Sequence, residues 1–282
     1  MKRPGIILRF IQSKLYLGRE EQEAETLAEI KEGAHFSGHN LWILGFAMVI
    51  ACVGLNTDSI SAVIGAMLIS PLMGPIVGFA FALAINDAEL KGKSIRNWVW
   101  MTGISLVASV LFFLVSPFDN NTAALSSFAK ASIFDILLAF FGGLAGFVGI
   151  IKKEGVKVIA TACMPPLCTA GFGIAHLDYP LFFGGLYFYL VNCLFIGLAT
   201  FLLARFTGFH KNKDVPGFRK TVNWLWSFFI IAMIVPATYI AYKKWNEQHA
   251  RDRAFVGTDK QRIDDLEKKI MRLDSLVQQM KK

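Results

Sequence analysis

Seven long apolar segments follow one another along the chain, separated by short polar stretches. Each is long enough to cross a bilayer, because about 20 helical residues span the roughly 30 Å of hydrocarbon. The predicted membrane-spanning helices lie at about residues 41–57, 62–86, 98–116, 132–151, 157–177, 180–204 and 223–242. The pattern therefore predicts an all-α polytopic membrane protein with about seven transmembrane helices, in a transmembrane domain over 40–242.

The segment that precedes the first span is polar, with one apolar stripe near its beginning. In residues 1–39, Ile7, Ile11 and Leu15 fall on one helical face. An amphipathic helix of this kind lies on the membrane surface or packs against the protein's own cytoplasmic face, and the sequence leaves both open. Residues 19–33 predict a polar, exposed helix that serves as a solvated connector.

Two of the spans contain paired prolines. The second span holds "LISPLMGP" and the fifth holds "MPPLC". Proline removes a backbone donor and interrupts a helix, and the freed backbone groups are tolerated in a membrane only inside protein or beside a cavity. We expect the two breaks to form a central solute or ion site, with these residues on the pathway: Ser70, Pro71, Gly74, Pro75, Pro165, Pro166 and Thr169.

The two proline-containing segments resemble each other. Residues 63–80 and 158–175, aligned without a gap at an offset of 95, share six identities in 18 positions. Each is the middle span of a group of three, at about 41–116 and 132–204, with 223–242 as an extra span. A unit with three spans ends on the opposite side of the membrane, so its copy is inserted upside down. The sequence predicts a 3+3 inverted repeat with broken helices two and five.

The same residues carry a family resemblance. "NTDSISAVIGAMLISPLMGPIVGFAFALAIND", "MPPLCTAGFGIA" and "YFYLVNCLFIG" resemble domain of unknown function 389, an uncharacterised family of hydrophobic bacterial membrane proteins. The resemblance covers about residues 38–242. It implies a domain of the bacterial inner membrane and names no substrate.

Basic residues in the loops predict the orientation. If the N-terminus is cytoplasmic, Lys130 is the single lysine or arginine of the outer loops. The inner loops then hold Lys91, Lys93, Arg96, Lys152, Lys153, Lys157, Arg205, Lys211, Lys213, Arg219 and Lys220. Cytoplasmic loops are enriched in lysine and arginine, so we expect the N-terminus in the cytoplasm and the C-terminus in the periplasm or outside the cell.

Composition narrows the function classes. Charged residues make up 18% of the chain, against about 25% in soluble domains, and the net charge of +8 follows the membrane topology rather than a nucleic-acid surface. The four cysteines lie in apolar spans without a C-x-x-C pair, and we expect no metal site and no cofactor. The sequence contains none of the nucleotide-binding or hydrolase motifs that would indicate an enzyme.

The tail at 243–282 predicts a soluble helix with a short heptad pattern. β-branched and leucine-like residues alternate at a and d positions: Ile263, Leu266, Ile270, Leu273, Val277 and Met280. This pattern favours a two-stranded coiled coil and hence a homo-oligomer. A single amphipathic helix that packs on another surface is the alternative.

Two further polar residues complete the expected pathway. Asp58 precedes the first broken span, where it either caps that helix or tunes the entry of a solute. Asn192 lies deep in the sixth span, where its amide is expected to bond carbonyls freed at Pro165 and Pro166. We therefore expect a transporter or channel for a small solute or ion, with the lipid bilayer as its surroundings. The alternative is a non-transporting membrane scaffold or sensor that oligomerises through its C-terminal helix.

Overall fold

The computed structural model describes residues 20–35, 38–117, 122–130, 132–152 and 163–209. The chain divides into two compact units, Met1–Ile230 and Ile231–Lys282, and every described residue belongs to the first. The predicted surface helix near Ile7, the span at 223–242 and the heptads of the tail lie outside the described residues.

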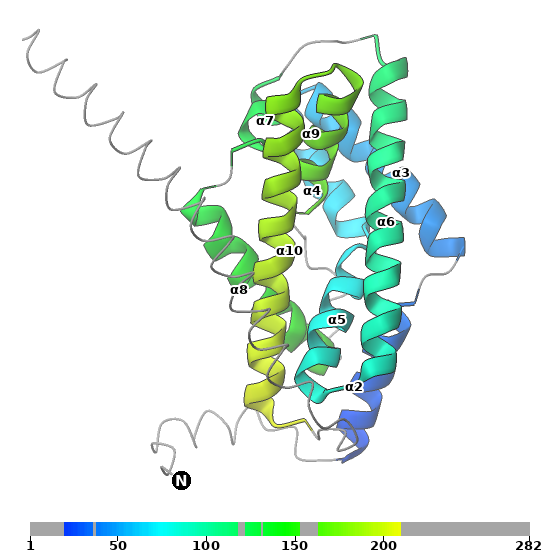
Figure 1. The fold of residues 1–282 in the computed structure, drawn as a ribbon, viewed down its shortest axis with the longest axis vertical. Coiled ribbons are helices and arrows are strands. Elements are labelled where there is room, and N and C mark those ends of the chain that lie inside the picture. The colour runs from blue at the N-terminus through cyan, green and yellow to red at the C-terminus, as the bar shows by residue number, and fades with distance from the viewer. Residues whose placement is uncertain (1–19, 36–37, 118–121, 131, 153–162, 210–282) are drawn as a thin grey trace, which may run out of the picture. The chain divides into compact units, whose positions relative to one another are not determined.

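The described residues form helices and contain no strand (Figure 1). The helices are α2 Glu20–Gly33, α3 Gly38–Asn56, α4 Ile60–Ile69, α5 Met73–Ile85, α6 Ala88–Val115, α7 Ala123–Ser127, α8 Ile133–Lys152, α9 Met164–Ala175 and α10 Tyr179–Thr207. Four of them, α3, α6, α8 and α10, are long and apolar enough to cross a membrane, and α4 with α5 forms a fifth, bent candidate. The all-α prediction is confirmed for the described residues, and these four or five apolar helices are consistent with a multi-pass membrane protein.

One boundary differs clearly from the prediction. Helix α6 begins at Ala88 rather than near residue 98, because the Asp87 side chain accepts a hydrogen bond from the Leu90 N–H and caps it. The predicted loop at 87–97 is therefore helical. Its charged side chains are those of an exposed helix end, where Lys93 pairs with Glu89 one turn earlier. A charged stretch beside a span was wrongly interpreted as a loop.

Helices α5 and α9 lie between the two longest helices, α6 and α10. Both short helices pack against both long ones. Figure 1 shows α9 beside one end of the α6 and α10 pair and α5 beside the other end. Around this group, α3 packs on α4, α6 and α9, and α8 packs on α10.

The polar sequence of residues 19–33 predicted a solvated connector, and this prediction is wrong for α2. Thr26, Ile30 and Ala34 are buried, and the helix packs against α5 and α8. Its C-terminal end comes so close to α5 that a Cβ added at Gly74 would collide with the Gly33 carbonyl. A helix with few apolar residues can still bury one narrow stripe, and here that stripe docks on α5.

Candidate functional site

The first predicted break lies where the prolines indicated. Helix α4 ends at Ile69, Ser70 is extended (φ −67°, ψ 128°), and α5 begins at Met73 with its axis bent by 52° from that of α4. Pro71 and Pro75 have no N–H to donate, so an unbroken helix would lose two of its bonds here. The Ser70 hydroxyl instead accepts from the Leu72 N–H at 3.3 Å. The expected irregularity at Ser70–Pro75 is confirmed.

The second pair of prolines marks the start of a helix. Pro165 and Pro166 lie in the first turn of α9, where a missing N–H removes no intrahelical bond. Residues 153–162, which precede this turn, lie outside the described part of the chain. With 12 residues, α9 is too short to cross a bilayer alone.

The contacts of α5 and α9 show how the two helices are directed. Gly78 of α5 faces Ser94, near the start of α6, whereas Gly171 of α9 faces Ser109, near its end. The turn from α5 to α6 lies at one end of α6, and the turn from α9 to α10 lies at the other (Figure 1). The N-terminal ends of α5 and α9 therefore both point toward the middle of α6, and the proline-containing segments are brought toward each other.

A polar cluster that the sequence did not indicate lies in this middle region. The Tyr189 hydroxyl of α10 accepts a hydrogen bond from the Trp98 indole N–H at 2.8 Å and lies 2.5 Å from the Thr102 hydroxyl. The sulfur of Cys193, one turn after Tyr189, lies 3.8 Å from the sulfur of Cys163, the residue just before α9. The i, i+4 spacing of Trp98 and Thr102 was the available signal, since it places two polar groups on one helical face.

Other buried polar residues lie along the same helices. Asn192 and Thr169 have no exposed surface. The Thr169 hydroxyl points to the Leu125 carbonyl at 3.5 Å. Ser105 is also fully buried, and its hydroxyl has no partner among the described residues. The interior between α6, α9 and α10 is thus more polar than its apolar sequence surroundings suggest.

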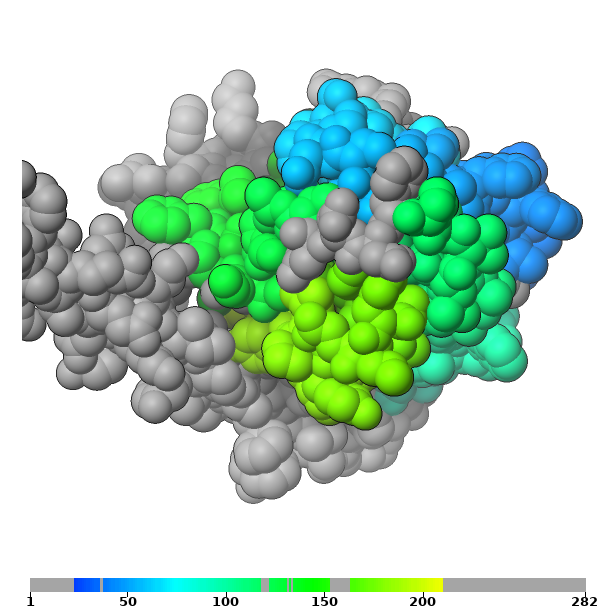
Figure 2. Space-filling view, turned by 90° about the horizontal axis from the view of Figure 1, so that it is seen from above, coloured from blue at the N-terminus to red at the C-terminus, as the bar shows by residue number. Residues whose placement is uncertain are grey.

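Asp58 lies apart from the breaks, in the turn between α3 and α4. Its backbone is left-handed (φ 52°), and its carboxylate accepts from the Ala124 N–H of α7 at 3.0 Å. Thr122 reinforces this contact, because its hydroxyl donates to the Leu55 carbonyl at 2.7 Å. Ser59, not Asp58, occupies the N-cap position of α4, and its side chain makes no capping hydrogen bond. Figure 2 shows the end of the molecule where the turn from α3 to α4, the end of α6 and the turn from α9 to α10 come together.

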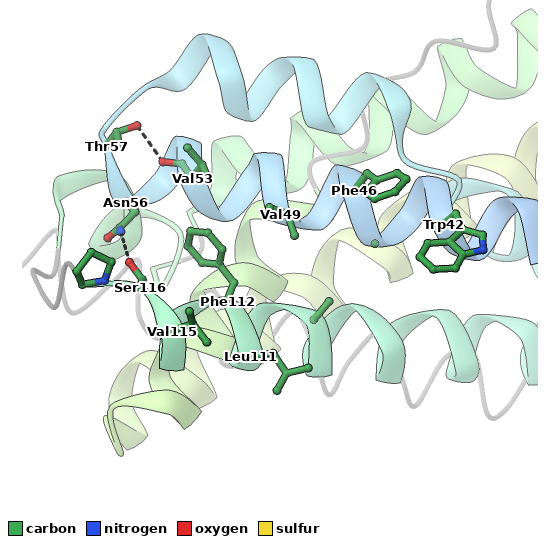
Figure 3. Close-up of a pocket in the computed structure, with 13 residues that line it drawn as sticks. Trp42, Phe46, Val49, Val53, Asn56, Thr57, Leu111, Phe112, Val115 and Ser116 are labelled. Atoms are coloured by element: carbon green, nitrogen blue, oxygen red, sulfur yellow. Dashed lines mark hydrogen bonds between the residues drawn. The ribbon is translucent and has the colours of Figure 1, made fainter.

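A groove separates α3 from α6 on the surface (Figure 3). It has a volume of about 690 Å³ and a nearly continuous apolar lining that includes Phe46, Val49 and Leu111. At one end the Asn56 amide donates to the Ser116 hydroxyl at 2.9 Å. An apolar surface of this kind between two spanning helices suits the acyl chains of the surrounding lipid.

Metal ligands of the usual kinds do not cluster in the described part of the chain. It contains no group of three histidine, cysteine, aspartate or glutamate residues that could hold an ion. Deep carboxylates are also missing from the described spans, where Asp87, Asp135 and Asp178 all lie at helix starts. Asp135 accepts from both the N–H and the hydroxyl of Ser132, as in a capping box.

Comparison with known families matches the middle of the chain. The family model described as Domain of unknown function (DUF389) covers residues 67–198. Residues 67–198 are a DUF389 domain. The resemblance seen in the sequence is thereby confirmed, and the DUF389 domain includes both proline-containing segments, Thr169 and Asn192, while Asp58 precedes it. No curated protein and no solved structure matches the chain.

Proposed function

We propose that this protein is a transporter or channel of the bacterial inner membrane for a small solute or ion, with its N-terminus in the cytoplasm. The observation that carries the proposal is the arrangement of α5 and α9. Two short helices start at proline-containing segments and point their N-terminal ends toward one region between α6 and α10. Discontinuous helices that meet near the middle of a membrane domain are the usual way in which transporters build a binding site.

The helix boundaries support an inverted repeat, in a register different from the one read in the sequence. Helices α5 and α6 start at Met73 and Ala88, and α9 and α10 start 91 residues later in each case, at Met164 and Tyr179. At this offset Pro75 corresponds to Pro166. The offset of 95 aligns identical residues in the two segments, but it does not align the first residues of these helices.

The turns before the long helices support the same register. Asn86 and Leu177 are both left-handed (φ 64° and 55°), and each precedes an aspartate that caps the next helix. The N–H groups of Asp87 and Asp178 each bond the carbonyl five residues earlier, at 2.9 and 2.8 Å. Two turns with the same sequence of unusual backbone conformations, at opposite ends of the bundle, fit one ancestral unit inserted twice.

Packing is consistent with a two-fold relation. A two-fold axis would exchange α3 with α8, α5 with α9, and α6 with α10. Helix α6 contacts α3, α5 and α9. Helix α10 contacts the corresponding helices α8, α9 and α5, as such an axis requires. Trp98 corresponds to Tyr189, and these two side chains bond each other. A residue contacts its own symmetry mate only near the axis. The proposed axis therefore runs close to this pair, beside the N-cap of α9.

The chemistry of this region favours some solutes over others. N-terminal helix ends present N–H groups that attract anions or polar oxygens. A divalent cation would need several carboxylates, and the described spans have none at depth. A small anion, a monovalent ion or a neutral polar solute fits better, with Ser70, Thr169 and Asn192 as its polar neighbours. Buried as they are, Thr169 and Asn192 would face an occluded site that opens by movement of α5 or α9.

The test is flux into proteoliposomes across a panel of small anions, monovalent cations and neutral solutes. We expect the wild type to move at least one of them faster than empty liposomes. Asn192→Leu should lower that flux by about tenfold or more, the equivalent of roughly 1.4 kcal/mol of lost interaction. Thr200→Val is the matched control, because Thr200 is equally buried in α10 and its hydroxyl donates to the Ile196 carbonyl of its own helix.

Two results would contradict the proposal. If the wild type moves nothing on the panel and binds a protein partner through its tail, the protein is a scaffold or sensor. If Asn192→Leu and Thr200→Val transport equally well, Asn192 is not part of the pathway.

A further inference from the structure

Three sulfur atoms meet in the interior between α3 and α9. Met48 and Cys52 are one turn apart on α3, and Cys168 lies opposite them on α9. The Cys168 sulfur lies 3.8 Å from the Met48 sulfur. Cys52 and Cys168 also share a partner, since Ser109 accepts from the Cys52 thiol and donates to the Cys168 carbonyl. All three side chains are fully buried. This cluster could not be predicted from the sequence, because Cys168 is more than a hundred residues from Met48 and Cys52 and the three residues form no motif.

We propose that Met48, Cys52 and Cys168 bind a soft monovalent cation, Cu(I) or its analogue Ag(I). Thiolate and thioether groups are the ligands that such ions prefer over oxygen and nitrogen. Metal–thiolate bonds of about 2.3 Å place two sulfurs on one ion roughly 3.8–4.0 Å apart. The separation of Cys168 and Met48 already has this value, so the site needs little rearrangement. This inference does not depend on the proposed transport function.

Charge balance also favours a monovalent ion. Binding exchanges one thiol proton for the cation, so that a Cys–S–metal unit and a released proton are formed. One thiolate neutralises one positive charge, and the thioether and the remaining thiol add no charge. A neutral site avoids the large cost of a net charge in an apolar interior. Zn²⁺ would require both thiolates and a fourth ligand.

Ser109 is placed to support the site from α6. Its hydroxyl donates to the Cys168 carbonyl at 3.1 Å, which leaves its oxygen to accept from the Cys52 thiol at 3.4 Å. Gly171 allows this approach, since a Cβ there would collide with Ser109. A hydrogen bond from a neighbouring helix fixes the orientation of a ligand and typically changes metal affinity by about 10–100-fold.

The second cysteine pair provides a matched control. Cys163 and Cys193 are also buried, and their sulfurs lie 3.8 Å apart, beside Tyr189, whose hydroxyl accepts from the Trp98 indole. If any pair of buried thiols were enough, both pairs would bind the ion equally. The proposal predicts that only the pair accompanied by Met48 does so.

The experiment is titration of the full-length protein in detergent with Ag⁺, and with Cu(I) under a reductant, followed by gel filtration and metal analysis. We expect about one ion per chain for the wild type and for a Cys163→Ser/Cys193→Ser variant. Binding should be lost in Cys52→Ser/Cys168→Ser. Met48→Leu, which conserves volume and should fold normally, is expected to bind about tenfold more weakly. X-ray absorption should show sulfur alone around the bound ion.

Three outcomes would overturn the assignment. The first is a wild type that retains no ion. The second is an equal loss of binding in the Cys163→Ser/Cys193→Ser and Cys52→Ser/Cys168→Ser variants. The third is tight binding of Zn²⁺ without binding of Ag⁺. If Met48→Leu elutes normally and binds the ion with unchanged affinity, the Met48 thioether is not a ligand and the site is not a three-sulfur centre.

Discussion

Replacing Gly185 by alanine tests the contact between α9 and α10 most directly. A Cβ at this position would lie 2.5 Å from the Pro166 carbonyl oxygen and 2.7 Å from the Ala170 nitrogen. Both are backbone atoms, so no flexible side chain can move aside. The Pro166 carbonyl belongs to the first turn of α9, and the collision therefore displaces the start of the half-helix itself.

The size of the effect follows from the overlap. Ordinary contacts of a Cβ begin at 3.4 Å, so α9 and α10 must separate by about 0.9 Å at this point. Overpacking of a close-packed interior typically costs about 1–3 kcal/mol. Gly103→Ala is the control, since a Cβ there, in the middle of the apolar helix α6, would meet nothing within 4 Å. That change should be neutral or stabilising by about 0.5–1 kcal/mol, because glycine is a poor helix former.

The measurement is reversible unfolding of both variants in mixed micelles, monitored by tryptophan fluorescence. We expect the free energy of unfolding of Gly185→Ala to fall below that of Gly103→Ala by about 1–3 kcal/mol, because both variants gain the same helix propensity and only Gly185→Ala overpacks. Equal stability of the two variants would mean that α9 and α10 are not in backbone contact. The start of α9 would then not lie against Gly185 of α10.

Three further predictions concern other parts of the chain. Leu177 is exposed and left-handed, so Leu177→Gly should raise the free energy of unfolding by about 1 kcal/mol, and a decrease would contradict the strained turn. An impermeant thiol reagent applied to intact cells should label a cysteine at Asn121 and not one at Lys93, and the buried native cysteines give little background. The reverse pattern would invert the proposed orientation. Lysine at Leu266 and Leu273 should reduce the fraction of homo-oligomer on gel filtration, and an unchanged oligomer would exclude the tail heptads as the cause.

Local chemistry made the broken helix predictable. Pro71 and Pro75 remove donors from an apolar segment, and this alone identifies where the helix between residues 60 and 85 is interrupted. Composition and segment length likewise sufficed for the all-α membrane architecture. These features depend on residues within a few positions of each other, so one sequence contains the information.

Contacts between distant segments could not be predicted in this way. Nothing in the polar sequence of α2 indicates that Thr26 and Ile30 are buried, because the partner surface belongs to α5 and α8. The pairing of Trp98 with Tyr189 depends on the register of two long apolar helices. Apolar segments match each other at several offsets, which is why the alignment at 95 was plausible. In the proposed repeat, the left-handed turns at Asn86 and Leu177 favour the offset of 91, and such backbone conformations cannot be predicted from an alignment of apolar residues.

The start of α6 illustrates a different limit. Lys93 and Arg96 were interpreted as loop residues because they are charged, yet a helix that leaves the membrane continues to satisfy its backbone internally. Asp87 provides the true boundary, since a cap is required where the first N–H groups lack partners. Aspartate before an apolar-to-polar transition was thus a better guide to the helix start than the charges that follow.

The proposed repeat extends to the short helices that precede each half. Helix α2 contacts α5 and α8, and α7 contacts α9 and α3, so exchanging the two halves converts one set of contacts into the other. At the offset of 91, Gly78, which faces Ala34 at the end of α2, corresponds to Thr169, which bonds the Leu125 carbonyl of α7. Each half-helix therefore packs against a short helix from the start of its own half of the proposed repeat. In the proposed transporter, a movement of α5 or α9 that opens the site would disturb these contacts with α2 or α7, and the hydrogen bond from the Ala124 N–H to Asp58 would hold α7 in place against it.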